Sequence, residues 1–244
     1  MTTAELIAAR RSEPWREELR KSKKNKERTD IPRVEMNELD AEYRSHTRLE
    51  EVNLGLTKEQ AMQEAQRCLD CPNPTCMQGC PVSINIPTFI KNIERGEFLE
   101  AARVLKETSA LPAVCGRVCP QEKQCESKCI HLKMKKAPVA IGYLEHFAAD
   151  YERESGNISV QEVAEKNGIK VAVIGSGPAG LSFAGDMAKR GYDVTVFEAL
   201  HEIGGVLKYG IPEFRLPNKI VDVEIEGLRK MGVKFVTNCI VGKT

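Results

Sequence analysis

From residue 169 onward, apolar positions follow the patterns of alternating strands and helices. Short apolar runs predict strands over 170–174 and 193–197, and the stretch between them predicts a helix over 178–190 that Gly191 ends. A further helix is expected over 216–231 and a third strand over 233–236. Strand, glycine turn, helix and strand form a βαβ unit, which predicts a parallel sheet.

Before residue 169 the apolar positions recur at helical spacing, and no strand pattern is present. Capping boxes that begin at Thr57 and Ser159 predict the starts of two helices. The expected helices span 57–69, a stretch from 87, 97–108, 138–152 and 159–168. We therefore predict a helical domain over 1–155, a linker over 156–168 and an α/β domain over 169–244.

The composition excludes few classes of protein, but it bears on the expected partners and the cellular compartment. The chain has 244 residues, a formal net charge of +1 and 29% charged residues, so nothing favours a nucleic-acid or membrane partner. Residues 1–30 form a charged arm, for which a solvated helix or a loose segment is expected. No secretion signal or membrane-length apolar run is present, which predicts a cytoplasmic protein with reduced cysteines.

Eight of the nine cysteines lie in two groups between Cys68 and Cys129. The groups are Cys68, Cys71, Cys76 and Cys80, then Cys115, Cys119, Cys125 and Cys129. A proline follows Cys80 and Cys119, and Cys–Pro in such groups is typical of iron–sulfur proteins. Four thiolates commonly hold one cluster, so the two groups could hold two four-iron clusters. By the ferredoxin pattern, Cys80 should serve the other cluster and a late cysteine should complete the first site.

Zinc is the main alternative to iron–sulfur clusters. Structural zinc sites usually present two Cys-x2-Cys pairs, or cysteine together with histidine. Here only Cys68 and Cys71 form such a pair, and the other intervals are longer. The spacing therefore favours clusters, with zinc, disulfides and inert thiols as the alternatives.

Glu145 lies on the apolar face of the helix expected over 138–152. A carboxylate in that position is costly unless it is paired or bound to a metal. From spacing alone, the simpler interpretation is that Glu145 lies at the edge of the apolar stripe and reaches water.

The glycine motif Gly175-x-Gly177-x-x-Gly180 follows an apolar strand and opens a helix. This context predicts a dinucleotide site, in which the glycines allow the backbone to approach a pyrophosphate at the helix N-terminus; the alternative is a purely structural glycine turn. Glu198 ends the second strand, where an acid would hydrogen-bond a ribose hydroxyl and disfavour a 2′-phosphate. The motif does not separate FAD from NAD.

With these cysteine groups and this glycine motif, the chain resembles the NADPH-dependent glutamate synthase small (β) subunit family. Its relatives include the N-terminal part of dihydropyrimidine dehydrogenase and the large subunit of NADH-dependent ferredoxin:NADP oxidoreductase. The segments that carry the resemblance are Glu64–Cys71, Gly79–Val82, Val114–Glu122, Gln124–Glu126 and Gly204–Pro217.

The resemblance implies a helical module with two [4Fe-4S] clusters, followed by the first part of a Rossmann-like FAD domain. It implies one cluster on Cys68, Cys71, Cys76 and Cys129, and another on Cys80, Cys119, Cys125 and Glu145, with Cys115 unligated. For FAD it implies Gly175, Ser176, Gly177, Pro178, Ala179 and Gly180 around the pyrophosphate, Glu198 on the ribose, and Gly205 and Leu207 nearby.

The resemblance also implies an activity in which NADPH reduces FAD and electrons pass through the clusters to a partner, here the glutamate synthase large subunit. The chain ends at Thr244 without a second dinucleotide motif, so we expect a truncated FAD domain and an NADPH site outside this chain. The alternatives are a subunit of a ferredoxin:NADP oxidoreductase or sulfide dehydrogenase and, from another class, a non-redox, metal-stabilised interaction module.

Overall fold

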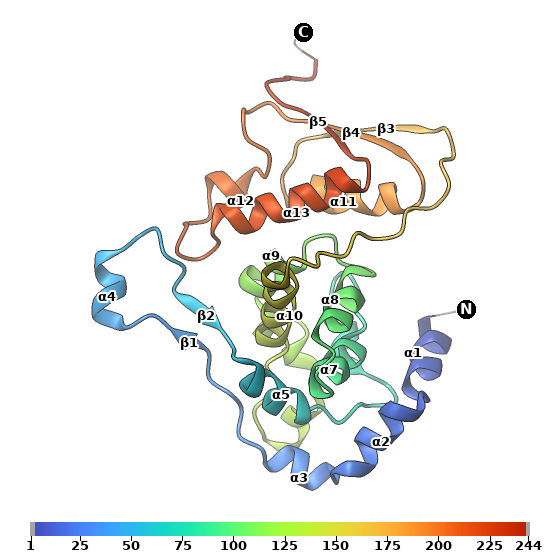
Figure 1. Cartoon of the computed structure of the whole chain (residues 1–244), viewed down its shortest axis with the longest axis vertical. Coiled ribbons are helices and arrows are strands. Elements are labelled where there is room, and N and C mark those ends of the chain that lie inside the picture. The colour runs from blue at the N-terminus through green and yellow to red at the C-terminus, as the bar shows by residue number, and fades with distance from the viewer. Residues whose placement is uncertain (1–2, 243–244) are drawn as a thin grey trace.

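The computed structural model describes residues 3–242, so the first two residues of the predicted arm and the last two of the predicted α/β domain lie outside it. The chain forms a helical part and an α/β part, which lie one above the other in Figure 1. This order of a helical domain followed by a parallel sheet confirms the predicted fold class.

The helical part is built from ten α-helices in the described chain. They are α1 Thr3–Arg11, α2 Pro14–Ser22, α3 Asn25–Asp30, α4 Ala41–His46, α5 Lys58–Gln66, α6 Thr75–Gln78, α7 Ile86–Glu94, α8 Phe98–Lys106, α9 Pro112–Val118 and α10 Ile141–Ser155. Helices α5, α7, α8 and α10 surround an apolar core, in which Phe98 meets Phe147 and Tyr151 edge to face at 5.1 and 4.9 Å. Thr57 caps α5 as predicted, because its hydroxyl accepts a hydrogen bond from the Gln60 amide.

The prediction that no strand precedes residue 169 is wrong. Strands β1 (Asn37–Glu38) and β2 (Asn53–Gly55) pair antiparallel in the extension at the left of Figure 1. They are too short to show a period of two, and the Asn37 side chain helps hold them together by donating to the Gly55 carbonyl at 2.9 Å.

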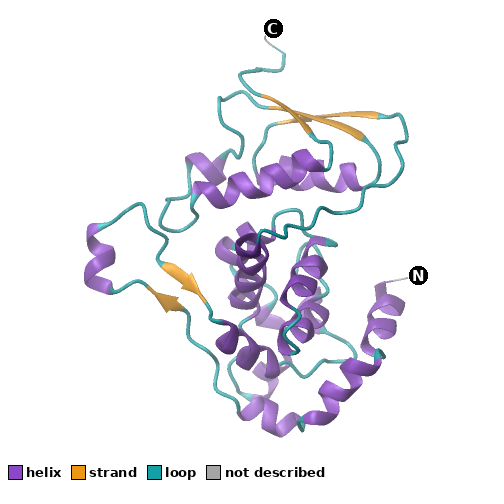
Figure 2. Cartoon of the chain, viewed as in Figure 1, coloured by secondary structure: helices purple, strands orange, loops and turns teal. Residues whose placement is uncertain are grey.

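The α/β part contains the predicted βαβ unit. Its elements are β3 Lys170–Ile174, α11 Pro178–Lys189, β4 Asp193–Phe197, α12 Val206–Tyr209, α13 Asn218–Lys230 and β5 Lys234–Val236. The strands form a parallel sheet in the order β3-β4-β5. Helices α11 and α13 lie together against one face of this sheet (Figure 2).

The helix predicted over 159–168 is absent, because its capping residue has another partner. The amide and hydroxyl of Ser159 both donate to the Glu152 carboxylate, at 3.1 and 2.6 Å, so Ser159 does not cap a helix. The segment instead runs alongside the end of α11, where the Ala164 amide donates to the Lys189 carbonyl at 2.9 Å. Tertiary contacts thus override the local capping signal.

The charged arm is packed against the helical part and is neither loose nor fully solvated. Arg16 and Arg28 are each only 1% exposed, and Arg28 forms a buried ion pair of 2.8 Å with Glu94 of α7. The expectation for residues 1–30 is therefore wrong for these two side chains, since composition does not reveal buried partners for a basic run.

Helix α9 connects the two parts of the chain. Leu111, Ala113 and Val114 belong to the apolar core of the α/β part, although they precede the predicted linker. Among residues 3–242, no helix has the combination of length and apolar character that crossing a membrane requires.

Candidate iron–sulfur and dinucleotide sites

Four cysteines from three separate segments line one apolar cavity. Cys68 and Cys71 follow α5, Cys76 lies in α6, and Cys129 follows a short 3-10 turn over 126–128. The segment with Cys76 is linked to the segment with Cys129 by a hydrogen bond, in which the Thr75 hydroxyl donates to the Lys128 carbonyl at 2.6 Å. The structure thus brings the implied first ligand set around one space, with Cys129 contributed from far along the chain.

The environment of this first group disfavours free thiolates. Burial raises the pKa of the Cys68 thiol to about 12, and it raises the pKa of Cys76 well above its ordinary value. Cys68, Cys129 and Cys71 lie close enough to Cys76 for their charges to raise its pKa further. Thiolates are the form that binds metal, so this donor set suits a group whose positive charge stabilises them.

A second group gathers around Glu145 of α10. Cys80, Cys119 and Cys125 come from three different loops. Glu145 and Cys119 are close enough to Cys80 to raise its pKa, although burial is the larger cause. Burial likewise raises the pKa of Cys125 to about 12, with Glu145 the next contributor. These are the residues that the resemblance assigns to a second cluster.

Two glycines allow the backbones of this second group to approach. A Cβ on Gly116 of α9 would lie 2.5 Å from the His146 amide nitrogen and 3.1 Å from the Glu145 carbonyl carbon. A Cβ on Gly79 would lie 2.5 Å from the Gln124 carbonyl oxygen and 3.0 Å from the Cys125 Cα. The sequence analysis missed both glycines as site residues, although each is adjacent in sequence to a cysteine of the groups.

Glu145 does not reach water, so the interpretation from spacing alone is wrong. It is 5% exposed, and its buried Oε1 has no hydrogen-bond partner. Burial raises the pKa of this carboxyl well above its ordinary value. A buried carboxylate oxygen that has no partner and lies among thiols could pair with the metal of a cluster, so the residues fit a cluster here.

Cys115 lies one helical turn before Cys119 on α9. Its thiol hydrogen-bonds to Cys119, and this bond lowers the pKa of Cys119 to about 7, against the opposing effect of burial. The Ser109 hydroxyl also approaches the Cys115 sulfur at 3.9 Å. The ligand roles of all these residues, and the unligated state of Cys115, remain predictions.

All nine cysteines are free thiols in the described part of the chain. Within residues 3–242, no group of three or more His, Cys, Asp or Glu side chains is close enough together to hold a metal ion.

The glycine turn after β3 is tight and leaves open space beside the start of α11. Gly175 has a φ of 91°, and a Cβ on Gly180 would lie 2.0 Å from the Gly175 carbonyl oxygen. A Cβ on Gly177 would meet nothing within 4 Å, and Pro178 and Ala179 are exposed at the start of α11. The N-terminus of α11 is therefore open to an anionic ligand.

Glu198 lies at the end of β4 and is held beside this turn. Its Oε2 accepts the amide of Ser176 at 2.8 Å as well as the Ser176 hydroxyl, and its Oε1 accepts the Leu200 amide at 2.9 Å. Burial acts to raise the pKa of Glu198, but these hydrogen bonds outweigh it and keep the pKa below its ordinary value. The carboxylate is thus ionised and oriented, as a ribose-binding acid needs to be.

The two residues expected near the remainder of FAD differ in position. Gly205 lies against the turn, because a Cβ on it would be 2.9 Å from the Gly177 Cα, and its φ is 54°. Leu207 is only 2% exposed and belongs to the apolar core. Leu207 is therefore a core residue, whereas Gly205 is half-buried beside the glycine turn.

A buried carboxylate connects the α/β part to α9. The Glu224 carboxylate of α13 accepts the amide of Ala113 at 2.6 Å. Burial raises the pKa of Glu224 to about 7, from an ordinary value of 4.5. The charged groups near it include Lys106, Arg117, Glu152 and Glu145.

Two protein families match the two parts of the chain. Residues 44–157 match the family described as dihydropyrimidine dehydrogenase domain II, 4Fe-4S cluster, and residues 173–231 match the NAD(P)-binding Rossmann-like domain. The solved structure of 6-hydroxypseudooxynicotine amine oxidase from Pseudomonas geniculata aligns over 66% of this chain and 22% of its own, at 23% identity and a TM-score of 0.32.

Curated relatives match most of this chain. The NAD-dependent dihydropyrimidine dehydrogenase subunit PreT of Escherichia coli K12 is 42% identical over 80% of this chain and 47% of its own length. The glutamate synthase [NADPH] small chains of Escherichia coli K12 and Azospirillum brasilense are 40% and 36% identical over 75% and 79% of this chain, and over 39% and 40% of their own lengths. This chain therefore spans about half the length of the relatives it matches, or less.

Residues 44–157 thus match a 4Fe-4S domain and residues 173–231 an NAD(P)-binding Rossmann-like domain, and the chain is homologous to parts of the glutamate synthase small chains and the PreT dehydrogenase subunits.

Proposed function

We propose that this chain is the cluster- and FAD-binding part of a cytoplasmic, NADPH-dependent electron-transfer subunit. The observation that carries the proposal is the convergence of two four-residue donor sets from distant segments. In one set, four cysteines line a cavity. In the other, Cys80, Cys119 and Cys125 lie near Glu145, whose buried Oε1 has no partner. Two separate sets of this kind suit two four-iron clusters.

The proposed ligands are the eight residues that the sequence analysis named. The first cluster would be held by Cys68, Cys71, Cys76 and Cys129, and the second by Cys80, Cys119, Cys125 and Glu145. Each thiol and the carboxyl must lose its proton to bind iron, and the charge of the metal supplies the driving force that burial opposes.

The proposed FAD site is the turn between β3 and α11. The amides at the start of α11 would bind the pyrophosphate, with Gly177 leaving room for it, and Glu198 would accept the ribose hydroxyls. When bound, FAD would accept two electrons from NADPH, whose own site is expected outside this chain, and the clusters would carry electrons singly.

The packing supports an order for the two cluster sites. Helix α9 contacts the α/β part at Ala113 and ends at Val118, directly before Cys119, so the second group lies on the connection to the dinucleotide domain. The first group lies beside the N-terminal arm, which contacts the turn between Cys68 and Cys71. We place the second cluster next to the flavin and the first cluster toward the partner.

Two partners are compatible with the relatives. By the resemblance, electrons would pass to a glutamate synthase large subunit, where glutamine and 2-oxoglutarate become two molecules of glutamate. The higher identity to PreT favours a second candidate, a dehydrogenase subunit that acts on pyrimidines with its own partner.

Anaerobic purification of the chain tests the cluster assignment. We expect a brown protein with equal amounts of iron and sulfide, and Cys129→Ser and Cys119→Ser should each remove a different cluster signal. Cys239→Ser is the matched control, since Cys239 lies outside both groups. A colourless, folded protein, or one with stoichiometric zinc, would refute the proposal.

The parent activity requires the full-length protein with its partner. Glutamate formation from glutamine and 2-oxoglutarate supports the first candidate, and pyrimidine turnover supports the second. Flavin retained by the full-length protein should be FAD, and Gly177→Val should prevent its retention because the side chain would occupy the space left for the pyrophosphate.

A further inference from the structure

The turn between Cys68 and Cys71 has a backbone conformation that needs support. Asp70 has a φ of 51°, in the left-handed region that a residue with a side chain adopts at a cost. Its carboxylate is completely buried, with an exposure of 0%. Both features lie between two of the thiols that line the first cavity.

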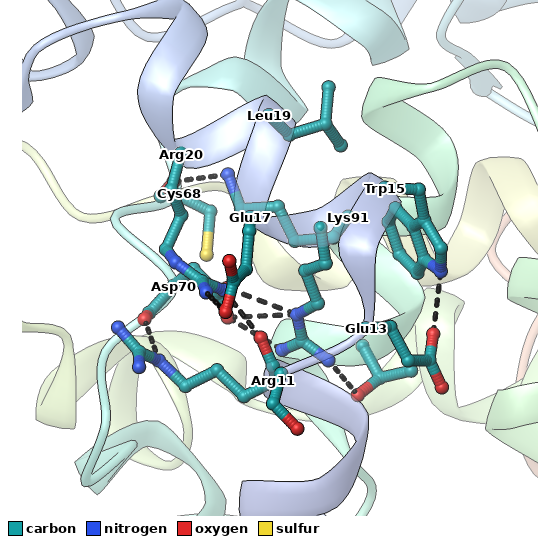
Figure 3. Close-up of polar contacts among 12 residues, drawn as sticks. Arg11, Glu13, Trp15, Glu17, Leu19, Arg20, Cys68, Asp70 and Lys91 are labelled. Atoms are coloured by element: carbon teal, nitrogen blue, oxygen red, sulfur yellow. Dashed lines mark hydrogen bonds and ion pairs between the residues drawn. The ribbon is translucent and has the colours of Figure 1, made fainter.

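Three arginines of the N-terminal arm contact this turn, and Figure 3 labels Arg11 and Arg20 among them. Arg16, which is itself buried, donates from Nε to both Asp70 carboxylate oxygens at 3.1 and 3.0 Å and from Nη2 at 2.5 Å. Arg20 donates to the same carboxylate at 2.6 Å, and Arg11 donates to the Asp70 backbone carbonyl at 2.9 Å. The arm therefore holds the turn by both its side chain and its backbone.

A fourth cation contacts the first cysteine directly. The ammonium of Lys91, which is fully buried on α7, donates to the Cys68 carbonyl at 2.6 Å and to Glu94 at 2.5 Å. Arg28 also pairs with Glu94, and Arg20 lies 3.9 Å from Glu17. Around the turn, five cations therefore face the three carboxylates of Asp70, Glu94 and Glu17. The first cavity therefore has an excess of positive charge at one side.

We infer that the N-terminal arm is a clamp that positions the Cys68–Cys71 turn for the first cluster and favours the reduced, more negative state of that cluster. Hydrogen bonding, net charge and solvent exposure around a cluster set its reduction potential, and partners that orient ligands strengthen metal retention. The arm precedes residue 44, where the match to the 4Fe-4S family begins, so the clamp lies outside the matched domain. The inference depends on the proposed function, because it assumes a cluster on Cys68 and Cys71.

The test uses the whole chain, loaded with iron and sulfide without oxygen. Arg16→Gln removes the buried pair, and Arg44→Gln is the matched control because Arg44 forms an exposed pair with Glu38. We expect Arg16→Gln to weaken iron retention at the first site roughly tenfold against a chelator, as loss of an outer partner does. It should also lower the midpoint potential of the first cluster in a spectroscopic redox titration, with the second cluster unchanged.

Arg20→Gln guards against simple misfolding, because Arg20 is partly exposed and contacts the same carboxylate from outside. The signal of the second cluster reports whether either variant is folded. Arg20→Gln should lower the potential of the first cluster alone, and an unchanged potential and iron retention in this variant would overturn the inference. A wild-type chain that holds no iron would instead overturn the proposed function, and the inference with it.

Discussion

Replacing Gly116 by alanine should remove the second cluster and spare the first. Gly116 lies in α9, where its Cα faces the backbone of α10 at Glu145 and His146. The added Cβ would lie 2.5 Å from the His146 nitrogen and 2.7 Å from its Cα, whereas ordinary contact begins at 3.4 Å. Backbone atoms cannot rotate aside as a flexible side chain can, so the two helices must separate.

The size of the effect follows from these distances. The helices must move apart by about 1 Å, which exceeds the roughly 0.5 Å within which a binding geometry must be held. Alanine gains roughly 0.5–1 kcal/mol over glycine within a helix, but overpacking costs about 1–3 kcal/mol. We therefore expect the metal-free chain to lose about 1–2 kcal/mol of unfolding free energy and to stay folded.

The assay combines chemical denaturation of the metal-free chain with iron analysis and spectroscopy of the loaded chain. Gly116→Ala should retain roughly half of the iron and sulfide, with only the signal of the first cluster. The control is Gly227→Ala in α13, where a Cβ meets nothing within 4 Å; it should be neutral or stabilising by up to about 1 kcal/mol and keep both clusters. If Gly116→Ala kept both clusters with unchanged spectra, the reasoning about helix approach would be refuted.

Three further predictions follow from buried carboxylates and their partners. Glu145→Ala should alter the signal of the second cluster only, and unchanged signals from both clusters would argue against its ligand role. Because the pKa of Glu224 is raised from 4.5 to about 7, the folded state binds the Glu224 proton more tightly than the unfolded state does. The metal-free chain should therefore lose up to about 3 kcal/mol of unfolding free energy as pH rises from 4.5 through 7. Denaturation curves at several pH values measure this loss, and Glu224→Gln should make it smaller. Ser176→Ala removes a hydrogen bond to Glu198 and should weaken FAD retention by the full-length protein about tenfold, measured by flavin fluorescence, and retention equal to wild type would show that Ser176 does not orient the acid.

The sequence by itself determined the local features of this protein. The spacing of apolar residues and glycines along the sequence suffices to identify the βαβ unit, because its strands, its helix and the turn at Gly175 each depend on neighbours within a few residues. The cap at Thr57 is predictable for the same reason, since both partners lie within one turn. The cysteine spacing likewise predicted an iron–sulfur domain, and residues 44–157 match a 4Fe-4S family.

Only the tertiary structure decided which distant groups meet. Ser159 carries the same capping signal as Thr57, but it binds Glu152 and no helix forms. Spacing predicted that Glu145 lies at the solvated edge of the apolar stripe of its helix. In the structure, α9 approaches α10 closely at Gly116, and Glu145 is buried among thiols. Composition predicted that the arm is a solvated segment. In the structure, Arg16 of the arm instead pairs in the interior with Asp70, which lies 54 residues away along the chain. A local pattern records what a residue prefers, but burial and pairing depend on contacts between segments that the order of residues does not specify.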